Sequence, residues 1–310
     1  MKICELKEGN TIRNCCYLIN DVKKGVDSNG NYYLSFVLQD NSGTIDAKKW
    51  SVTEIEISLF QKNELILIKQ ATVRSFNNRL QLKIDEASIA NKEGAVLDNF
   101  VIASPLPKDQ LEEEFLYYKK SIKNPNLKLI VDEIFNRYYK DYIEYPAASK
   151  NHHEFHHGLL YHSVGMAKLA EQIVKLYNDV DYDLLISGCL LHDIGKLIEL
   201  SGVLATSYTT EGILLGHISI GASLIKEISD ELKIEGEEPM LLMHMILSHH
   251  GKMEFGSPIL PHTREALLLS MIDDLDSKMM ILDKAYKNVN NGEFTDRIFP
   301  LDNISYYKKK

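Results

Sequence analysis

The sequence predicts a multidomain α and β protein, with an N-terminal five-stranded β-barrel followed by an all-α domain. Apolar residues alternate from residue 11 to about residue 89, as in half-buried strands. Beyond residue 105 they recur at the i, i+3, i+4 and i+7 spacing of helices. The 310 residues also exceed the roughly 100 to 200 residues of a typical domain. We therefore expect two domains with a boundary between residues 90 and 107.

Strands are expected in the N-terminal region because turn residues separate short alternating apolar runs. Residues 33–39 and 65–68 show the alternation, and turn-forming residues occupy 27–30, 40–43 and 77–78. A helix-like stretch near residues 53–60 lies between the third and fourth predicted strands. Five strands with a helix in that position resemble the OB-fold of nucleic-acid-binding domains.

The predicted barrel carries candidate residues for binding a single strand. OB-folds stack bases on aromatic rings while basic side chains follow the backbone. Arg74, Phe76 and Arg79 belong to a basic, polar turn that has little reason to be buried, and Trp50 is the only tryptophan. Core packing and base stacking are equally open for Trp50, whereas Phe36 is expected in the core.

Helices are expected over residues 110–121, 128–139, 159–177, 184–200, 217–232, 240–249 and 264–289. With the barrel, they divide the chain into an OB-fold domain over residues 1–95, a linker and first helix over 96–125, and a helical domain over 126–310.

Composition indicates a globular protein with an uneven charge. Residues 1–95 contain 13 Lys and Arg against 12 Asp and Glu, and the remaining residues contain 22 against 32, so the acidic excess of the chain belongs to the C-terminal part. A local basic groove in the N-terminal part is compatible with this balance. No window approaches the roughly 18 apolar residues of a membrane span, so we expect a cytoplasmic protein without membrane contact. The four cysteines show no CxxC spacing and support neither a zinc knuckle nor a disulfide framework.

A metal site is expected in the middle of the chain. All 11 histidines lie between His152 and His262. The pair His192-Asp193 occupies an apolar, helix-like run, and other histidines and Asp273 occupy similar runs. Imidazole and carboxylate together suit first-row metals such as Mn²⁺, Fe²⁺ or Zn²⁺.

The series His162, His192, Asp193 and Asp273, with Lys196 shortly after the central pair, resembles the HD-domain phosphohydrolase superfamily. Its members are helical proteins whose H…HD…D residues bind metal. The resemblance implies that these two histidines and two aspartates hold a first cation. We expect Asp193 and Lys196 to be catalytic, with Lys196 holding phosphate or stabilising developing charge. A lysine extended along the surface is the alternative for Lys196.

The resemblance also extends to a second cation. His217 and His249 match histidines that two-metal members add, with Asp193 as the bridge, and His250 is an alternate to His249. Gly158 stands where some two-metal members carry a glutamate, so one or two ions per chain are both open.

Other polar residues of this region are not expected to bind the metal directly. We expect His244 to be structural and Asp276 to support the ligands or lie on the surface. The histidines at 152, 153, 156 and 157 form a loop cluster that either touches phosphate or is solvated.

The domain order resembles a narrower family, the YhaM-type 3′-to-5′ exoribonucleases of Gram-positive bacteria. An OB-fold precedes an HD domain in about 310 residues, and residues 146–153 precede the motif at 158–162. The resemblance implies metal-dependent hydrolysis of single-stranded RNA to nucleoside 5′-monophosphates, with Mn²⁺ as the expected ion. Single-stranded DNA as a further substrate and a homo-oligomeric state are left open.

Two other functions compete with this one. An HD nucleotide or cyclic-nucleotide phosphohydrolase would act on a small substrate, but a mononucleotide needs no strand-binding domain. A non-catalytic single-strand-binding replication accessory protein would keep only a vestigial site, but the H…HD…D set is complete.

Overall fold

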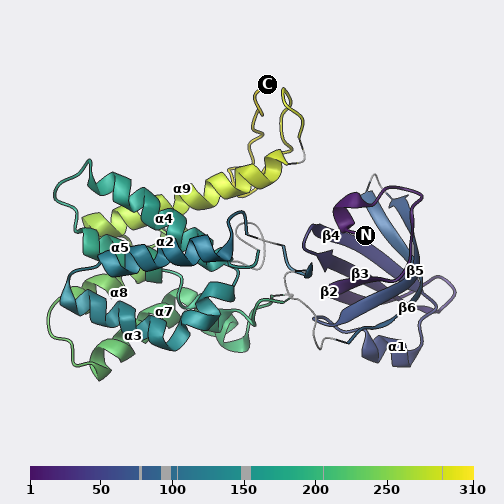
Figure 1. The fold of residues 1–310 in the computed structure, drawn as a ribbon, viewed down its shortest axis with the longest axis horizontal. Coiled ribbons are helices and arrows are strands. Elements are labelled where there is room, and N and C mark those ends of the chain that lie inside the picture. The colour runs from purple at the N-terminus through teal and green to yellow at the C-terminus, as the bar shows by residue number, and fades with distance from the viewer. Residues whose placement is uncertain (77–78, 92–98, 103, 148–154, 205, 288) are drawn as a thin grey trace. The chain divides into compact units, whose positions relative to one another are not determined.

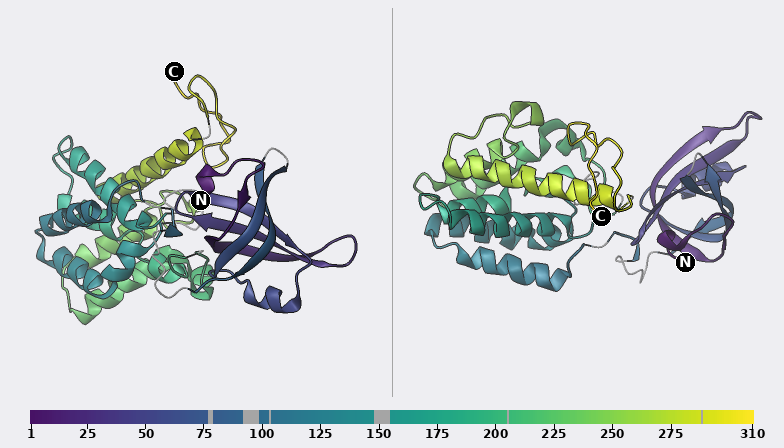
Figure 2. Two further views of the ribbon diagram at one scale, coloured as in Figure 1. Left: turned by 45° about the vertical axis from the view of Figure 1, so that its right-hand side comes forward. Right: turned by 90° about the horizontal axis from the view of Figure 1, so that it is seen from above.

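The computed structural model describes residues 1–76, 79–91, 99–102, 104–147, 155–204, 206–287 and 289–310. The chain forms two compact units, a strand unit at the N-terminus and a helical unit that begins at Ser104 (Figure 1; Figure 2). Among the described residues, no helix combines the length and hydropathy that a membrane crossing requires.

The strand unit is a closed barrel with the connectivity of an OB-fold (Figure 1). Its elements are β1 (Thr11–Ile12), β2 (Cys15–Val26), β3 (Tyr32–Asp40), β4 (Gly43–Trp50), α1 (Glu54–Leu59), β5 (Leu65–Phe76) and β6 (Arg79–Ile89). Antiparallel pairing joins β2 to β3, β3 to β4, β5 to β6 and β5 to β2, and β4 pairs in parallel with β6. The circle β2-β3-β4-β6-β5 therefore closes. In the chain, α1 lies between β4 and β5, the third and fourth strands of the barrel in sequence order. The predicted five-stranded OB-fold is confirmed, and β1 is a two-residue addition along β5.

Alternation along the strands separates the barrel interior from its outer face. On β3, Leu34, Phe36 and Leu38 are buried, while the side chains between them are partly exposed. Phe36 is 1% exposed, as expected, and Phe60 after α1 packs edge-on against it with 5.9 Å between ring centroids. Thr53 caps α1 by accepting a hydrogen bond from the backbone N–H of Glu56.

The helical unit contains nine labelled elements, and its helices pack around one apolar core. They are α2 (Lys108–Ser121), α3 (Pro125–Glu144), α4 (Gly158–Val174), α5 (Tyr182–Leu191), α6 (Lys196–Glu199), α7 (Thr210–Glu231), α8 (Glu238–Ser248), the 3-10 turn η3 (Met253–Phe255) and α9 (Arg264–Tyr286). Every residue of α5 from Leu184 onward is buried. This makes α5 the central helix, and side chains at its end point into the protein interior.

The prediction of a single helix over residues 184–200 is wrong. The helix α5 ends at Leu191, a turn follows, and α6 starts at Lys196. A Cβ atom at Gly195 would lie 2.0 Å from the backbone oxygen of His217, so the turn touches α7 backbone to backbone. His192 and Asp193 thus lie at the end of a helix and not in its middle.

The helix expected from residue 217 also begins earlier. Thr209 caps α7 by accepting from the N–H of Gly212, and the helix is kinked at Gly216, where φ is 70°. The first turns expose Ile213 and Leu214, which removes the one-sided apolar pattern that sequence periodicity detects.

Replacing Gly195 by alanine should destabilise the helical unit. The added methyl group would collide with α7 backbone, which cannot rotate away as a side chain can, so we expect a loss of about 3 kcal/mol in the free energy of unfolding. Urea denaturation followed by circular dichroism measures this loss. Ser219→Ala, at an exposed position of α7, is the control and should change the midpoint little. A Gly195→Ala midpoint equal to that of the control would contradict the close approach.

Candidate functional site

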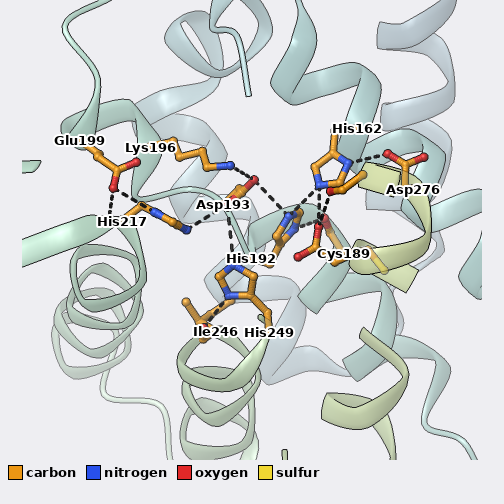
Figure 3. Close-up of polar contacts among 12 residues, drawn as sticks. His162, Cys189, His192, Asp193, Lys196, Glu199, His217, Ile246, His249 and Asp276 are labelled. Carbon is orange, nitrogen blue, oxygen red and sulfur yellow. Dashed lines mark hydrogen bonds and ion pairs between the residues drawn. The ribbon is translucent and has the colours of Figure 1, made fainter. Parts of the chain in front are cut away.

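Five helices bring one cluster of histidines and carboxylates together inside the helical unit (Figure 3). The cluster consists of His162 from α4, His192 and Asp193 after α5, His217 from α7, His249 and His250 after α8, and Asp273 from α9. These residues are separated by up to 111 positions in sequence and are all those predicted as ligands.

One half of the cluster surrounds His162. Its Nε2 atom lies 3.1 Å from Oδ1 of Asp273 and 3.2 Å from Nε2 of His192. The Nε2 atom of His192 is in turn 3.2 Å from Oδ2 of Asp193. His162, His192 and Asp193 offer ligand atoms within 4.8 Å of one another, which is close enough to share one cation.

The other half of the cluster faces the second oxygen of Asp193. Oδ1 of Asp193 lies 3.5 Å from Nε2 of His217 and 3.8 Å from Nε2 of His249. His217, His249 and His250 also offer ligand nitrogens within 4.8 Å of one another. The structure therefore places both His249 and His250 in the second group, so they need not be alternatives. The two oxygens of Asp193 face the two groups.

Backbone carbonyl groups fix the orientation of three imidazoles. In each case Nδ1 donates to a carbonyl oxygen: His192 to Cys189 at 3.1 Å, His249 to Ile246 at 2.7 Å, and His250 to Phe255 at 2.7 Å. Because a carbonyl oxygen only accepts, Nδ1 must carry the hydrogen, and in the neutral ring Nε2 keeps its lone pair for a metal.

Carboxylates support the other two imidazoles of the cluster. Oε1 of Glu199 accepts from Nδ1 of His217 at 3.0 Å, and Oδ2 of Asp276 accepts from Nδ1 of His162 at 2.7 Å (Figure 3). Such partners orient a ligating histidine and raise its basicity. Asp276 thus contacts a predicted ligand, which is one of the two positions expected for it. The sequence analysis did not assign a role to Glu199. An acidic residue directly after the apolar pair of α6 was the signal that could have pointed to it.

Asp193 is held as an anion in the protein interior. Burial alone would raise the pKa of its carboxyl, but Lys196 and His192 hold that pKa well below its usual range. The Nζ atom of Lys196 donates to Oδ2 of Asp193 at 2.6 Å. Burial opposes the charge of Lys196 as well, yet Asp193 raises the pKa of the ammonium group. With a side chain 12% exposed, Lys196 is not a surface lysine.

The histidines differ in protonation. Burial disfavours a charged His162, but hydrogen bonds to Asp273 and Asp276 raise its pKa to about 10. For His249, burial and the neighbouring His250 hold the pKa well below its usual range. His249 is therefore neutral, as a ligand must be, while a cation that binds at His162 displaces a proton.

Unpartnered atoms provide a direct test of whether the cluster fits a cation. Among the described residues, Oδ1 of Asp193, Nε2 of His217 and Nε2 of His249 are buried without a hydrogen-bond partner. Leaving such atoms unpaired is costly, and a native protein rarely leaves three together. A divalent cation would satisfy all three, so the donor set fits a transition metal with nitrogen and oxygen ligands.

A pocket of about 220 Å³ opens onto the cluster. It is lined by Asp193, Lys196, His250, Phe255, Ser270, Asp273, Asp274 and Ser277. Both expected catalytic residues, Asp193 and Lys196, thus face a space that a ligand can enter.

The histidines ahead of α4 are not solvated where they are described. His156 and His157 are 6% and 8% exposed, and their rings stack with 3.8 Å between centroids. His156 contacts the carboxylate of Glu144, and Nδ1 of His157 contacts the carbonyl oxygen of Ile143. The alternative of a solvent-exposed histidine cluster is therefore wrong for His156 and His157. Residues 148–153 of the expected motif lie outside the described residues.

The residues predicted to bind nucleic acid occupy two parts of the barrel. Phe76 and Arg79 are cross-strand partners on β5 and β6, both exposed, and line a pocket of about 340 Å³ with Asp46. Arg74 is exposed two residues before Phe76. Trp50 is 41% exposed and lies four residues beyond Asp46 on β4, roughly 13 Å away at 3.3 Å per residue. The turn at 77–78 lies outside the described residues.

The model of the HD domain family matches residues 159–278. That span begins three residues before His162 and ends five residues after Asp273, so it includes every residue of the cluster. Residues 159–278 form an HD domain. The HD domain covers much of the helical unit, and the OB-fold barrel precedes it.

Three solved structures are similar to parts of the chain. The second OB-fold domain of replication protein A from Methanococcus maripaludis is 21% identical over 30% of this chain and 95% of that chain, with a TM-score of 0.23. An OB domain from Thermoplasma acidophilum is 16% identical over 31% and 89%, with a TM-score of 0.23. The HD domain of the phosphodiesterase PgpH from L. monocytogenes is 19% identical over 54% and 76%, with a TM-score of 0.29. The strand pairing and the order of the helices define the fold.

If the two groups hold separate cations, substitutions should remove them separately. We expect about two Mn²⁺ ions per wild-type chain, about one in His217→Ala, and almost none in Asp193→Ala, because Asp193 faces both groups. Inductively coupled plasma mass spectrometry after dialysis measures the content. His244→Ala is the control, because His244 is a histidine outside the cluster. Its Nε2 atom accepts from the backbone N–H of His262 at 2.9 Å. Two ions retained in His217→Ala would show that the second group is not a metal site.

Proposed function

We propose that this chain is a metal-dependent 3′-to-5′ exoribonuclease that hydrolyses single-stranded RNA to nucleoside 5′-monophosphates, with single-stranded DNA as a possible second substrate. The observation that carries the proposal is the two-sided cluster at Asp193, which opens to a pocket in a chain that also has an OB-fold barrel. The 3′ polarity, the preference for RNA and the choice of Mn²⁺ are supported by the resemblance of the sequence to YhaM-type exoribonucleases.

The cluster would hold two cations through separate residues. His162, His192 and Asp273 would hold one, His217, His249 and His250 the other, and Asp193 would contact both. Bound there, divalent cations neutralise the phosphate oxygens and make hydroxide available near neutral pH.

The protein's own groups would position the phosphodiester. The ammonium group of Lys196 lies in the pocket lining and is kept charged by Asp193. It can donate to a phosphate oxygen and stabilise the negative charge that grows in the transition state. The bond to Oδ2 of Asp193 holds this ammonium group in place before substrate arrives, so little reorganisation is needed.

An aromatic row on the outer face of the barrel supports single-strand binding. Gly25, Tyr33 and Trp50 are direct cross-strand neighbours on β2, β3 and β4. A Cβ at Gly25 would lie 2.3 Å from the Tyr33 ring, so glycine allows this ring to lie across the strand. The ring centroids of Tyr33 and Trp50 are 4.8 Å apart, and Nζ of Lys48 lies 5.3 and 5.4 Å from them. Such a surface suits bases and the phosphates between them.

A row of lysines lies beside the aromatic row. Lys23, Ser35, Lys48 and Lys83 are successive cross-strand neighbours on β2, β3, β4 and β6, two positions along from the aromatic residues and therefore on the same face. Like charges directly opposite, such as Lys48 and Lys83, are unfavourable for folding. Asp21 lies 3.6 Å from Nζ of Lys23 and Asp85 lies 3.5 Å from Nζ of Lys83, so carboxylates offset part of this repulsion. A bound polyanion would compensate the charge of Lys48 as well, which favours a nucleic acid as the ligand of this face.

A gel assay with 5′-labelled single-stranded RNA and Mn²⁺ tests the reaction. We expect a ladder that shortens from the 3′ end, and no ladder with chelator. Asp193→Ala should abolish hydrolysis, because it removes the carboxylate common to both groups, and should leave the circular dichroism spectrum nearly intact. Intact RNA with hydrolysed nucleotides would indicate a small-substrate phosphohydrolase. A shifted but intact strand would indicate a binding protein, and turnover by Asp193→Ala would reject the site.

The barrel face can be tested by the fluorescence of the single tryptophan. Oligonucleotide binding should quench Trp50, and Lys48→Gln should reduce the dependence of log K on log salt concentration by about 0.7, as expected for one lost phosphate contact on a single strand. Lys69→Gln is the control, because Lys69 already pairs with Glu86 at 2.9 Å. Unchanged Trp50 emission at saturation would argue against stacking on this row.

A further inference from the structure

The pocket beside the histidine and carboxylate cluster has two chemically different groups of lining residues. Asp193, Lys196, His250 and Asp273 belong to the cluster. Phe255, two serines and Asp274 complete the lining. Pockets that enclose drug-sized ligands measure about 300 to 1000 Å³. At about 220 Å³, this pocket suits one small unit of a polymer, such as a single nucleotide.

Phe255 is placed at the pocket by a short turn and not by apolar packing. The residue is 56% exposed, although it belongs to a 3-10 turn. Its carbonyl oxygen accepts from Nδ1 of His250 at 2.7 Å, and its N–H donates to the carbonyl oxygen of Lys252 at 3.1 Å. The main chain of Phe255 therefore fixes a cluster histidine, while its side chain remains free of the core.

Two glycines fix the turn. Gly251 and Gly256 have φ angles of 73° and 99°, in the left-handed region that favours glycine. A Cβ at Gly251 would approach the side chain of Ser270 to 3.3 Å, so the turn packs tightly against α9. The ring of Phe255 is thereby held on the same short segment as His250.

The lining residues outside the cluster have the chemistry of a nucleoside site. An aromatic face stacks on any base without reading its sequence, which suits an enzyme that removes every nucleotide in turn. Nζ of Lys252 lies over the Phe255 ring, 5.1 Å from its centroid, and 3.6 Å from Oε1 of Glu254. A base would therefore stack on the other face of the ring. Ser270 and Ser277 donate their hydroxyl protons to the carbonyl oxygen of Leu267 and to Oδ1 of Asp273, and Oδ2 of Asp274 accepts from Lys278. The lone pairs that remain on these oxygens can accept from ribose hydroxyl groups.

We propose that Phe255 forms a nucleoside subsite, in which its ring stacks on the base of the 3′-terminal nucleotide whose phosphate accepts from Lys196. This inference rests on the proposed function and adds to it the recognition of the base. It makes a base on the terminal unit a requirement for efficient cleavage, and distinguishes the substrate from phosphate esters that lack one.

Two RNA strands that differ only at the 3′ end test the subsite, one ending in a nucleotide and the other in an abasic ribose. For the wild type, kcat/KM should be about 5- to 150-fold higher for the strand with the terminal base, the range expected from one stacked base. Phe255→Ala should remove this preference by slowing cleavage of the normal end only. Phe255→Trp should keep it.

Matched controls separate stacking from damage to the site. Met253→Ala, at a 65% exposed position of the same turn, should keep the wild-type preference. Because Phe255→Ala retains the backbone carbonyl group that fixes His250, its Mn²⁺ content should equal that of the wild type. Loss of Mn²⁺ would assign the ring a role in supporting the cluster and overturn the subsite.

The two proposals fail in different ways. If Phe255→Ala cleaves both strands but keeps the wild-type preference, the subsite is wrong and the exoribonuclease proposal stands. If the wild type with Mn²⁺ shortens neither strand, the proposed function is wrong and the subsite fails with it.

Discussion

The buried carboxylate of Asp193 is the interaction on which the arrangement of the candidate site depends. It is 3% exposed, and an isolated charge at such a position would be strongly unfavourable. Lys196 compensates it directly, and the imidazoles of the adjacent His192 and of two other segments, at His217 and His249, surround it. Each of these groups has to reach the same point, which constrains how the helices that carry them can pack. The close backbone contact at Gly195 is part of this requirement, since it brings α7 next to the turn that holds Asp193.

The OB-fold barrel could be predicted closely because its strands follow a local rule. Half-buried strands alternate with a period of two, and the turns between them are rich in glycine, asparagine and aspartate. The capped helix α1 appears within one residue of its expected limits. Closure by the parallel pairing of β4 with β6 has no local signal, and was expected only because the element order matches a known fold.

In the HD domain, the sequence predicted the candidate ligands better than it predicted the helix ends and the groups around the ligands. The ligands were visible because histidine and aspartate are unusual in apolar helical runs. The end of α5 at Leu191 was not, because it results from contact with α7 and not from a breaking residue. Glu199 was missed since its role depends on a partner 18 residues away. His156 and His157 were misjudged because their burial depends on Glu144 and the end of α3.

The histidines of the cluster are oriented by two kinds of partner, and these differ in how they tolerate change in the sequence. The carbonyl groups at Cys189, Ile246 and Phe255 are supplied by the main chain, so many side chains at these positions leave the orienting bond in place. Glu199 and Asp276 act through their side chains, and a single substitution removes the bond. A chain could therefore keep every histidine and aspartate of the H…HD…D pattern and still hold its ions poorly. Among proteins with this pattern, the residues at these two positions would distinguish a competent site from a decayed one.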